Sequence, residues 1–280
     1  MKIRNTARYI LGNLDGFDVN SLVPVNEMPE LDRWALSTLS KLITSVKASY
    51  DRYEYHTIYH AIHNFCAVDM SNFYLDIIKD RLYCNEKNGL SRRSAQTTIY
   101  IILDALVRML APLLAFTTEE IWSYMPKREG VDSESVILNQ MPEPMPQDIL
   151  TPEREEVFVN LKKLRADVNK ALEIARNEKE IGKSLDADVE IYLSDEAKKK
   201  FSAIADMDLP DLFIVSSVNV HDGNAQGYEG VEFKGVTIVV KPSDSPMCSR
   251  CWKHDKNVGT KADHPTLCPR CYDIVINHPM

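Results

Sequence analysis

The stretch RRSAQTTIYIILDALVRMLAPLLAF, residues 92–116, carries apolar residues at three- and four-residue spacing along most of its length. This spacing predicts a long helix with a dense apolar face that must pack against other helices. Pro112 interrupts the pattern near its end, because proline lacks the backbone N–H that a helix interior needs. We therefore expect this segment to be one member of a helical bundle.

The segments on either side of residues 92–116 extend the same pattern. Helical spacing of apolar residues recurs over residues 2–14, 31–53 and 55–83, and a short helix is predicted at 117–125, capped by Thr117 or Thr118. The run NEKNGLS, residues 85–91, is typical of a turn between helices. The sequence thus predicts a mainly α protein that begins with an up-down helical bundle, assigned to residues 1–145.

The chain changes character beyond the bundle. A proline-rich loop covers residues 126–150, and a long helix is predicted over 153–182, ending at Gly182. Alternating patterns then predict strands at 187–194, 212–220 and 233–241, with a short helix at 195–205. We assign residues 146–242 to a long helix plus a small α+β junction module, and residues 243–280 to a separate zinc-binding tail.

Composition limits the classes of protein to which the chain can belong. The 280-residue chain has a formal net charge of −8, which argues against a general, charge-driven DNA binder but allows a local basic face for RNA. It contains no run of about 18 apolar residues, and its first twenty residues lack the apolar core of a signal peptide. We therefore expect a cytoplasmic protein with no membrane partner.

The tail contains the strongest motif, a pair of similar runs, CSRCW (248–252) and CPRCY (268–272). Cys248 and Cys251 form one CxxC pair, Cys268 and Cys271 the other, with sixteen residues between them. Two residues between cysteines let a tight turn direct both sulfurs at one ion, and four thiolates complete a closed tetrahedral zinc site. The motif predicts one structural Zn²⁺, which would supply on the order of 10 kcal/mol of folding energy to a segment with little core of its own.

Other uses of these cysteines remain open. Two disulfides or free thiols are possible in principle, although a chain without a secretion signal favours metal. A ligand set of three cysteines with His254 or His264 is a second alternative. No Walker loop, GxSxG, HExxH or strand-linked GxGxxG motif occurs, so the residues indicate no catalytic group.

Two groups of residues are candidates for RNA contact. The first lies on the N-terminal helix, where Arg4 and Arg8 share one face; its members are Lys2, Arg4, Asn5 and Arg8. The second surrounds the cysteines and contains Arg250, Trp252, Lys253 and Arg270. Cations suit phosphates, and aromatic rings stack on unpaired bases. The competing interpretation is a solvated helix face for the first group, and packing of Trp252 and Tyr272 on the cysteine turns for the second.

Several of these segments, taken in order, resemble a known family. The segments are KIRNTARYILGNLDGFD, LDRWALSTLSKL, AIHNFCAVDMSNFYLDIIKDRLY, RRSAQTTIYIILDALVRMLAPLLAFTTEEIW, RNEKEIGKSLDADVEIY and the closing CSRCW…HPTLCPRCY. Together they look like the C-terminal portion of bacterial-type isoleucyl-tRNA synthetases. The resemblance covers essentially the whole chain and implies an anticodon-binding helical bundle followed by the zinc-binding region.

The resemblance also defines what to expect of function. It implies a partner, tRNA(Ile), and an intact ligase that uses ATP through a catalytic half absent from this chain, because the HIGH and KMSKS signatures do not occur here. We expect a monomer that binds tRNA but not DNA and does not activate isoleucine by itself. Two alternatives remain: a structural zinc scaffold that binds no RNA, and a zinc-finger protein of the DNA-repair type.

Overall fold

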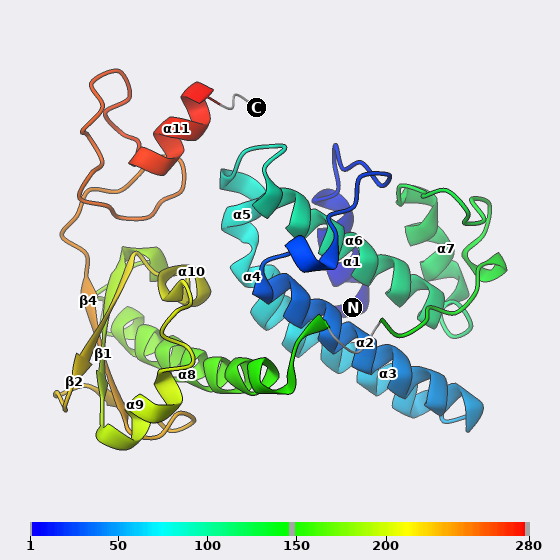
Figure 1. The fold of residues 1–280 in the computed structure, drawn as a ribbon, viewed down its shortest axis with the longest axis horizontal. Coiled ribbons are helices and arrows are strands. Elements are labelled where there is room, and N and C mark those ends of the chain that lie inside the picture. Colours follow the sequence, from blue (N-terminus) through cyan, green and yellow to red (C-terminus); the bar gives the residue numbers. More distant parts are fainter. Residues whose placement is uncertain (1, 146–148, 278–280) are drawn as a thin grey trace. The chain divides into compact units, whose positions relative to one another are not determined.

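The computed structural model describes residues 2–145 and 149–277. The chain forms two compact units, unit 1 (Met1–Thr151) and unit 2 (Pro152–Met280). Both are shown in Figure 1. The expected boundary at residues 145 and 146 falls beside residues 146–148, which lie outside the described part. The further division of unit 2 at residues 242 and 243 stays a prediction.

Unit 1 is helical, as the apolar periodicity predicts. Its elements are α1 (Lys2–Gly12), η1 (Val25–Glu27), α2 (Glu30–Asp51), α3 (Tyr55–Asn64), η2 (Phe65–Tyr74), α4 (Leu75–Ile77), α5 (Lys79–Cys84), α6 (Leu90–Leu110), α7 (Ala115–Tyr124) and η3 (Val136–Leu138). Helix α6 packs against α1, α2, α5 and α7. Apolar residues on its inner face, including Ile99 and Leu103, are fully buried, as are Leu39 and Ile43 of α2. Residues 92–116 thus supply much of the core of this unit.

The helix predicted over residues 55–83 is not regular. Its middle part, η2, is a π-helical segment, in which each turn holds more residues than an α-turn. The Ser71 hydroxyl donates to the carbonyl of Cys66, five residues earlier, at 2.7 Å, and lies 3.4 Å from the hydroxyl of Thr6 on α1. The wider turn therefore coincides with a polar contact between η2 and α1.

Unit 2 places one long helix against a four-stranded sheet. Its elements are α8 (Pro152–Asn177), η5 (Ser184–Asp186), β1 (Ala187–Leu193), α9 (Asp195–Phe201), α10 (Leu209–Phe213), β2 (Ser217–Asp222), β3 (Tyr228–Glu229), β4 (Val236–Pro242) and α11 (Pro269–Asn277). The strand order is β2-β1-β4-β3, with β1 parallel to β2 and antiparallel to β4. Burial alternates along β1, and α8 packs against β4 (Figure 1).

Three local predictions are wrong. The strand expected at 212–220 begins instead as α10, because Asp208 caps Asp211 and Pro210 occupies the first turn, and β2 starts only at Ser217. Helix α8 ends before Gly182, since Lys179 takes up the left-handed conformation (φ 64°) and reverses the chain.

The third wrong prediction is the N-terminal cap of the short helix predicted at 117–125. Helix α7 begins at Ala115, with Leu114 in the cap position and no side-chain cap. Thr118 lies inside the helix and donates to the carbonyls of Leu114 and Ala115. Hydroxyls that bond backward in this way cannot cap.

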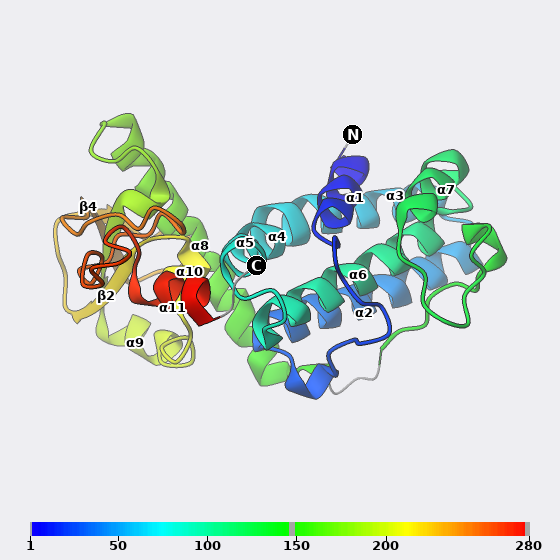
Figure 2. The same cartoon turned by 90° about the horizontal axis from the view of Figure 1, so that it is seen from above.

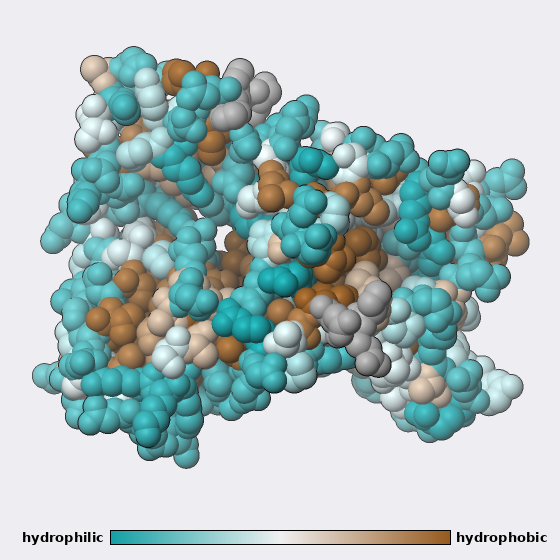
Figure 3. Space-filling model, viewed as in Figure 1, coloured by the Kyte–Doolittle hydropathy of each residue, from teal (hydrophilic) through white to brown (hydrophobic). Residues whose placement is uncertain are grey.

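The surface is largely hydrophilic on the face shown, with hydrophobic patches on both units (Figure 3). Among the described residues, no helix is both long enough and apolar enough to cross a membrane.

Candidate functional site

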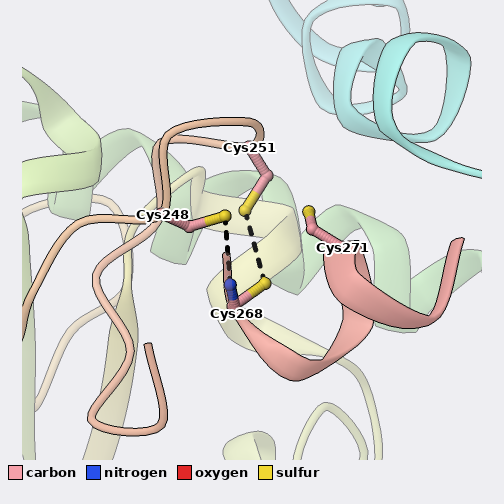
Figure 4. A group of neighbouring side chains, drawn as sticks. All are labelled: Cys248, Cys251, Cys268 and Cys271. Atoms are coloured by element: carbon pink, nitrogen blue, oxygen red, sulfur yellow. Dashed lines mark hydrogen bonds between the residues drawn. The ribbon is translucent and has the colours of Figure 1, made fainter. Parts of the chain in front are cut away.

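The four cysteines of the tail meet in unit 2. Their sulfur atoms lie within 4.8 Å of one another, and all four residues are buried. Figure 4 shows Cys248 and Cys251 on one turn and Cys268 and Cys271 at the start of α11, with the thiols turned toward a common centre. Sixteen intervening residues thus return the chain so that both CxxC pairs face each other.

Backbone hydrogen bonds shape both cysteine turns. In the first, the Trp252 N–H donates to the Cys248 carbonyl at 2.9 Å, and the Cys248 N–H to the Lys253 carbonyl at 2.9 Å. Trp252 adopts φ 64°, a left-handed conformation that lets the chain reverse directly after the second cysteine. The second turn becomes helix α11, with a proline in the first position and the Tyr272 N–H bonded to the Cys268 carbonyl at 2.9 Å.

The electrostatics of the cluster fit a divalent cation. Hydrogen bonds from Cys251 and Cys268, with a contribution from Arg250, lower the pKa of the Cys271 thiol well below its usual range. Hydrogen bonds with Cys251 and Cys271 raise the pKa of Cys268. The Cys271 thiolate therefore forms readily, whereas the Cys268 thiol resists ionisation. Four thiolates at this distance would repel one another, and a dication at the centre would remove that repulsion.

Additional donors surround the sulfurs. The backbone N–H of Cys268 donates to Cys248 Sγ at 3.3 Å, and Arg250 Nη1 to Cys271 Sγ at 3.7 Å. Such outer contacts orient ligands and stabilise their negative charge. The donor set, soft sulfur in a closed group of four, is the one that structural zinc prefers.

The two histidines considered as alternative ligands are engaged elsewhere. His254 Nδ1 lies 2.6 Å from the Ser245 carbonyl, and its Nε2 is 3.6 Å from Asp186. The His264 ring packs edge-on against Tyr272, with the ring centroids 5.9 Å apart. Within residues 2–145 and 149–277, the group that could hold a metal consists of the four cysteines.

The candidate RNA contacts of the tail do not form a free basic patch. Lys253 forms an ion pair with Asp211, and Arg250 is half-buried against the cysteine cluster. Arg270 is half-buried beside Cys268 and Lys256, in a cavity between the tail and the α+β module. Trp252 is 55% exposed, with the Lys183 ammonium 5.1 Å from its ring, so it does not pack into a core on the cysteine turns.

The candidate contacts on α1 are exposed, as expected for a binding face. Lys2, Arg4, Asn5 and Arg8 all lie at the surface of unit 1. One of them is already paired: Arg4 Nη2 donates to both carboxylate oxygens of Glu120 on α7, at 2.9 and 3.0 Å.

The sequence alone does not reveal the α7 side of this surface. Arg4, Asn5 and Arg8 line a groove whose opposite wall contains Glu120 and Tyr124. These two residues are four apart on a helix and therefore share one face, a signal that TTEEIWSYM contains. Nothing local in the sequence indicates that this face meets α1.

Comparison with known proteins agrees with this architecture. The family model described as the anticodon-binding domain of tRNA ligase matches residues 32–191, and a model described as a zinc finger found in FPG and IleRS matches residues 247–274. The second match covers all four cysteines and supports one structural zinc.

Three similar proteins support the same family assignment. Isoleucine–tRNA ligases from Syntrophotalea carbinolica and Desulforamulus reducens are each 46% identical, over 98% and 99% of this chain. The enzyme of the same name from Brevibacillus brevis is 44% identical over 99% of it. The chain spans only 29–30% of the length of these relatives.

The first family model accounts for more than half of the 280 residues, and the finger follows it in the order found here. The chain therefore belongs to the family of tRNA-ligase anticodon-binding domains, in the form that ends with the zinc finger of isoleucyl-tRNA synthetases.

Proposed function

We propose that this chain is the tRNA-binding part of an isoleucine–tRNA ligase. Its helical unit docks the anticodon stem-loop of tRNA(Ile), so that a catalytic part outside this chain can attach isoleucine using ATP. The observation that carries this proposal is the co-occurrence, in one chain, of the anticodon-binding match at 32–191 and the zinc finger at 247–274.

In this function the metal has a structural role. Cys248, Cys251, Cys268 and Cys271 would hold one Zn²⁺ as thiolates, which leaves no coordination position for a substrate. The bound metal supplies folding energy and neutralises the thiolates. The protein's own part is to present the four sulfurs from two turns and to shield them from water by burial.

Arg8 is the best placed of the predicted RNA contacts. It is exposed on α1, one turn beyond Arg4, and has no ion-pair partner among the residues that the structure describes. Lys2 and Asn5 share its exposure, whereas Arg4 is paired with Glu120. Phosphate contacts from these residues would position the RNA without reading its sequence. Arg250, Trp252, Lys253 and Arg270 form the second proposed contact region, with Lys253 and Arg250 partly committed to protein partners.

A titration of tRNA(Ile) tests this function. We expect the zinc-loaded chain to bind labelled tRNA(Ile), measured by fluorescence anisotropy at several salt concentrations. Arg8→Ala should weaken binding to tRNA(Ile) and to other tRNAs alike, and reduce the log–log salt slope by about one unit, as loss of one phosphate contact does. The matched control is Lys163→Ala, which removes one charge from an exposed position of α8. Equal salt slopes for the two variants would show that Arg8 belongs to a solvated helix face that does not contact RNA.

The same titration separates the alternatives. A structural zinc scaffold would bind neither tRNA nor DNA, and a DNA-repair protein would prefer duplex DNA. The zinc finger alone does not discriminate, because its family model is shared by FPG and IleRS. The anticodon-binding match favours RNA. We further propose that the chain acts as a monomer and does not bind DNA.

A further inference from the structure

Helices α1 and α7 form the two walls of a groove in unit 1. The α1 wall consists of Arg4, Asn5, Arg8 and Leu11, and the α7 wall of Glu120, Ile121 and Tyr124. The two helices pack against each other and are seen together from above in Figure 2. The groove has a volume of about 450 Å³, within the range of pockets that hold small ligands.

One aromatic ring on the α7 wall remains uncovered. Tyr124 is 74% exposed at the end of α7, although it lines the groove. Leu11 and the largely buried Ile121 also line the groove. A flat ring with an apolar border offers a stacking surface, which any nucleobase can use because every base has a π-face.

Two arginines line the groove, and they differ in their partners. Arg4 donates to both carboxylate oxygens of Glu120, so the two opposite charges offset each other. This pair connects the two walls. Arg8, one turn further along α1, has no ion-pair partner among the described residues, so it adds a positive charge to the lining of the groove. Asn5 adds an amide that both donates and accepts hydrogen bonds, as the edge of a base requires.

We propose that the α1–α7 groove holds one unpaired nucleotide of the bound RNA, with its base stacked on Tyr124 and its phosphate at Arg8. This inference rests on the proposed function and deepens it, since it gives the tRNA-binding surface a specific pocket. Arg4 is engaged by Glu120 across the groove, so the phosphate of this nucleotide is assigned to Arg8. A splayed-out base is what single-stranded loops of RNA offer to such rings.

The experiment uses anticodon stem-loop RNAs in which 2-aminopurine replaces one loop base at a time. Stacking of this base on an aromatic ring quenches its fluorescence. With the zinc-loaded chain we expect quenching at one loop position. Tyr124→Leu should abolish that quenching and weaken binding about fivefold or more, the lower limit for loss of one stacked base. Tyr124→Phe should retain both. The matched control is Phe116→Leu, because Phe116 is a 93% exposed ring on the same helix that does not line the groove.

The possible outcomes distinguish a failure of this inference from a failure of the proposed function on which it rests. If the unmodified chain binds no tRNA or stem-loop RNA, both are overturned. If it binds but Tyr124→Leu and Phe116→Leu behave alike, the groove assignment is overturned and tRNA binding stands. Circular dichroism of Tyr124→Leu checks that the helices remain. Because the side chain is mostly exposed, we expect an unchanged spectrum.

Discussion

At the scale of single residues, Asp32 shows how unit 1 is held together. Its carboxylate is fully buried and accepts hydrogen bonds from Tyr74 at 2.7 Å, Arg81 at 2.8 and 2.6 Å, and Ser94 at 2.5 Å. These partners come from η2, α5 and α6, so one side chain of α2 links three other elements. Burial, followed by the nearby negative charge of Asp32, raises the pKa of Tyr74 well above its usual range and keeps it a hydrogen-bond donor.

Loss of this charge should destabilise unit 1 strongly. Asp32→Asn leaves the Arg81 guanidinium without its carboxylate in a largely buried place, and breaking such a pair costs about 3–5 kcal/mol. We expect the free energy of unfolding, measured by urea titration followed by circular dichroism, to fall by roughly this amount. Asp15→Asn, at an exposed loop position, is the matched control and should change little. A loss below about 0.5 kcal/mol, typical of surface substitutions, would contradict the role of Asp32.

At the scale of elements, the tail depends on its cysteine cluster. The buried residues of segment 247–274 are the four cysteines with Leu267 and Ile274, too few to form a core of their own. The tail is also attached to the rest of unit 2 by the His254 N–H bond to Ser216 at 2.7 Å and by the Lys253–Asp211 pair. These contacts locate the segment, but they replace little of the folding energy that a metal provides.

Removal of the metal should therefore unfold the tail. We expect about one zinc per purified chain by elemental analysis, and well below half in Cys268→Ala, which lacks one of four ligands. Hydrogen exchange of α11 and the turn at 248–252 should speed up in Cys268→Ala and after chelation, while the α8 amides stay protected. Cys84→Ala, which removes a buried thiol outside the cluster, should keep its zinc. Full zinc content in Cys268→Ala would disprove the ligand set.

At the scale of the whole molecule, the chain contains two separate cores, one in unit 1 and one in unit 2. Unit 1 is stabilised by interlocking helices around α6, and unit 2 by α8 on the sheet together with the cysteine cluster. Because each unit has its own buried core, we expect a substitution in one core to leave the stability of the other unchanged.

Differential scanning calorimetry can test this independence. We expect two unfolding transitions, of which Asp32→Asn lowers only one and Cys268→Ala only the other, with the double variant showing the sum. A shift of several degrees corresponds to about 1 kcal/mol in domains of this size. A single cooperative transition, or a shift of both by either variant, would show that the units unfold together.

Local chemistry along the chain was sufficient to predict the helical bundle, the long helix, two of the strands and the cysteine site. Helical periodicity and CxxC spacing depend on neighbouring residues, because the α-helix and the tight turn are themselves formed by short-range hydrogen bonds. The mainly α fold and the four clustered cysteines are confirmed on this basis.

Long-range packing decided the remainder. The early end of α8 and the wide turn of η2 have no local signal, because helix periodicity is compatible with several end points and turn widths. The α1–α7 groove and the ion pair between Arg4 and Glu120, which are 116 residues apart, both depend on the packing that brings α7 beside α1. Residues this distant in sequence become neighbours only when the apolar faces of the bundle pack, and no spacing along the chain carries that information.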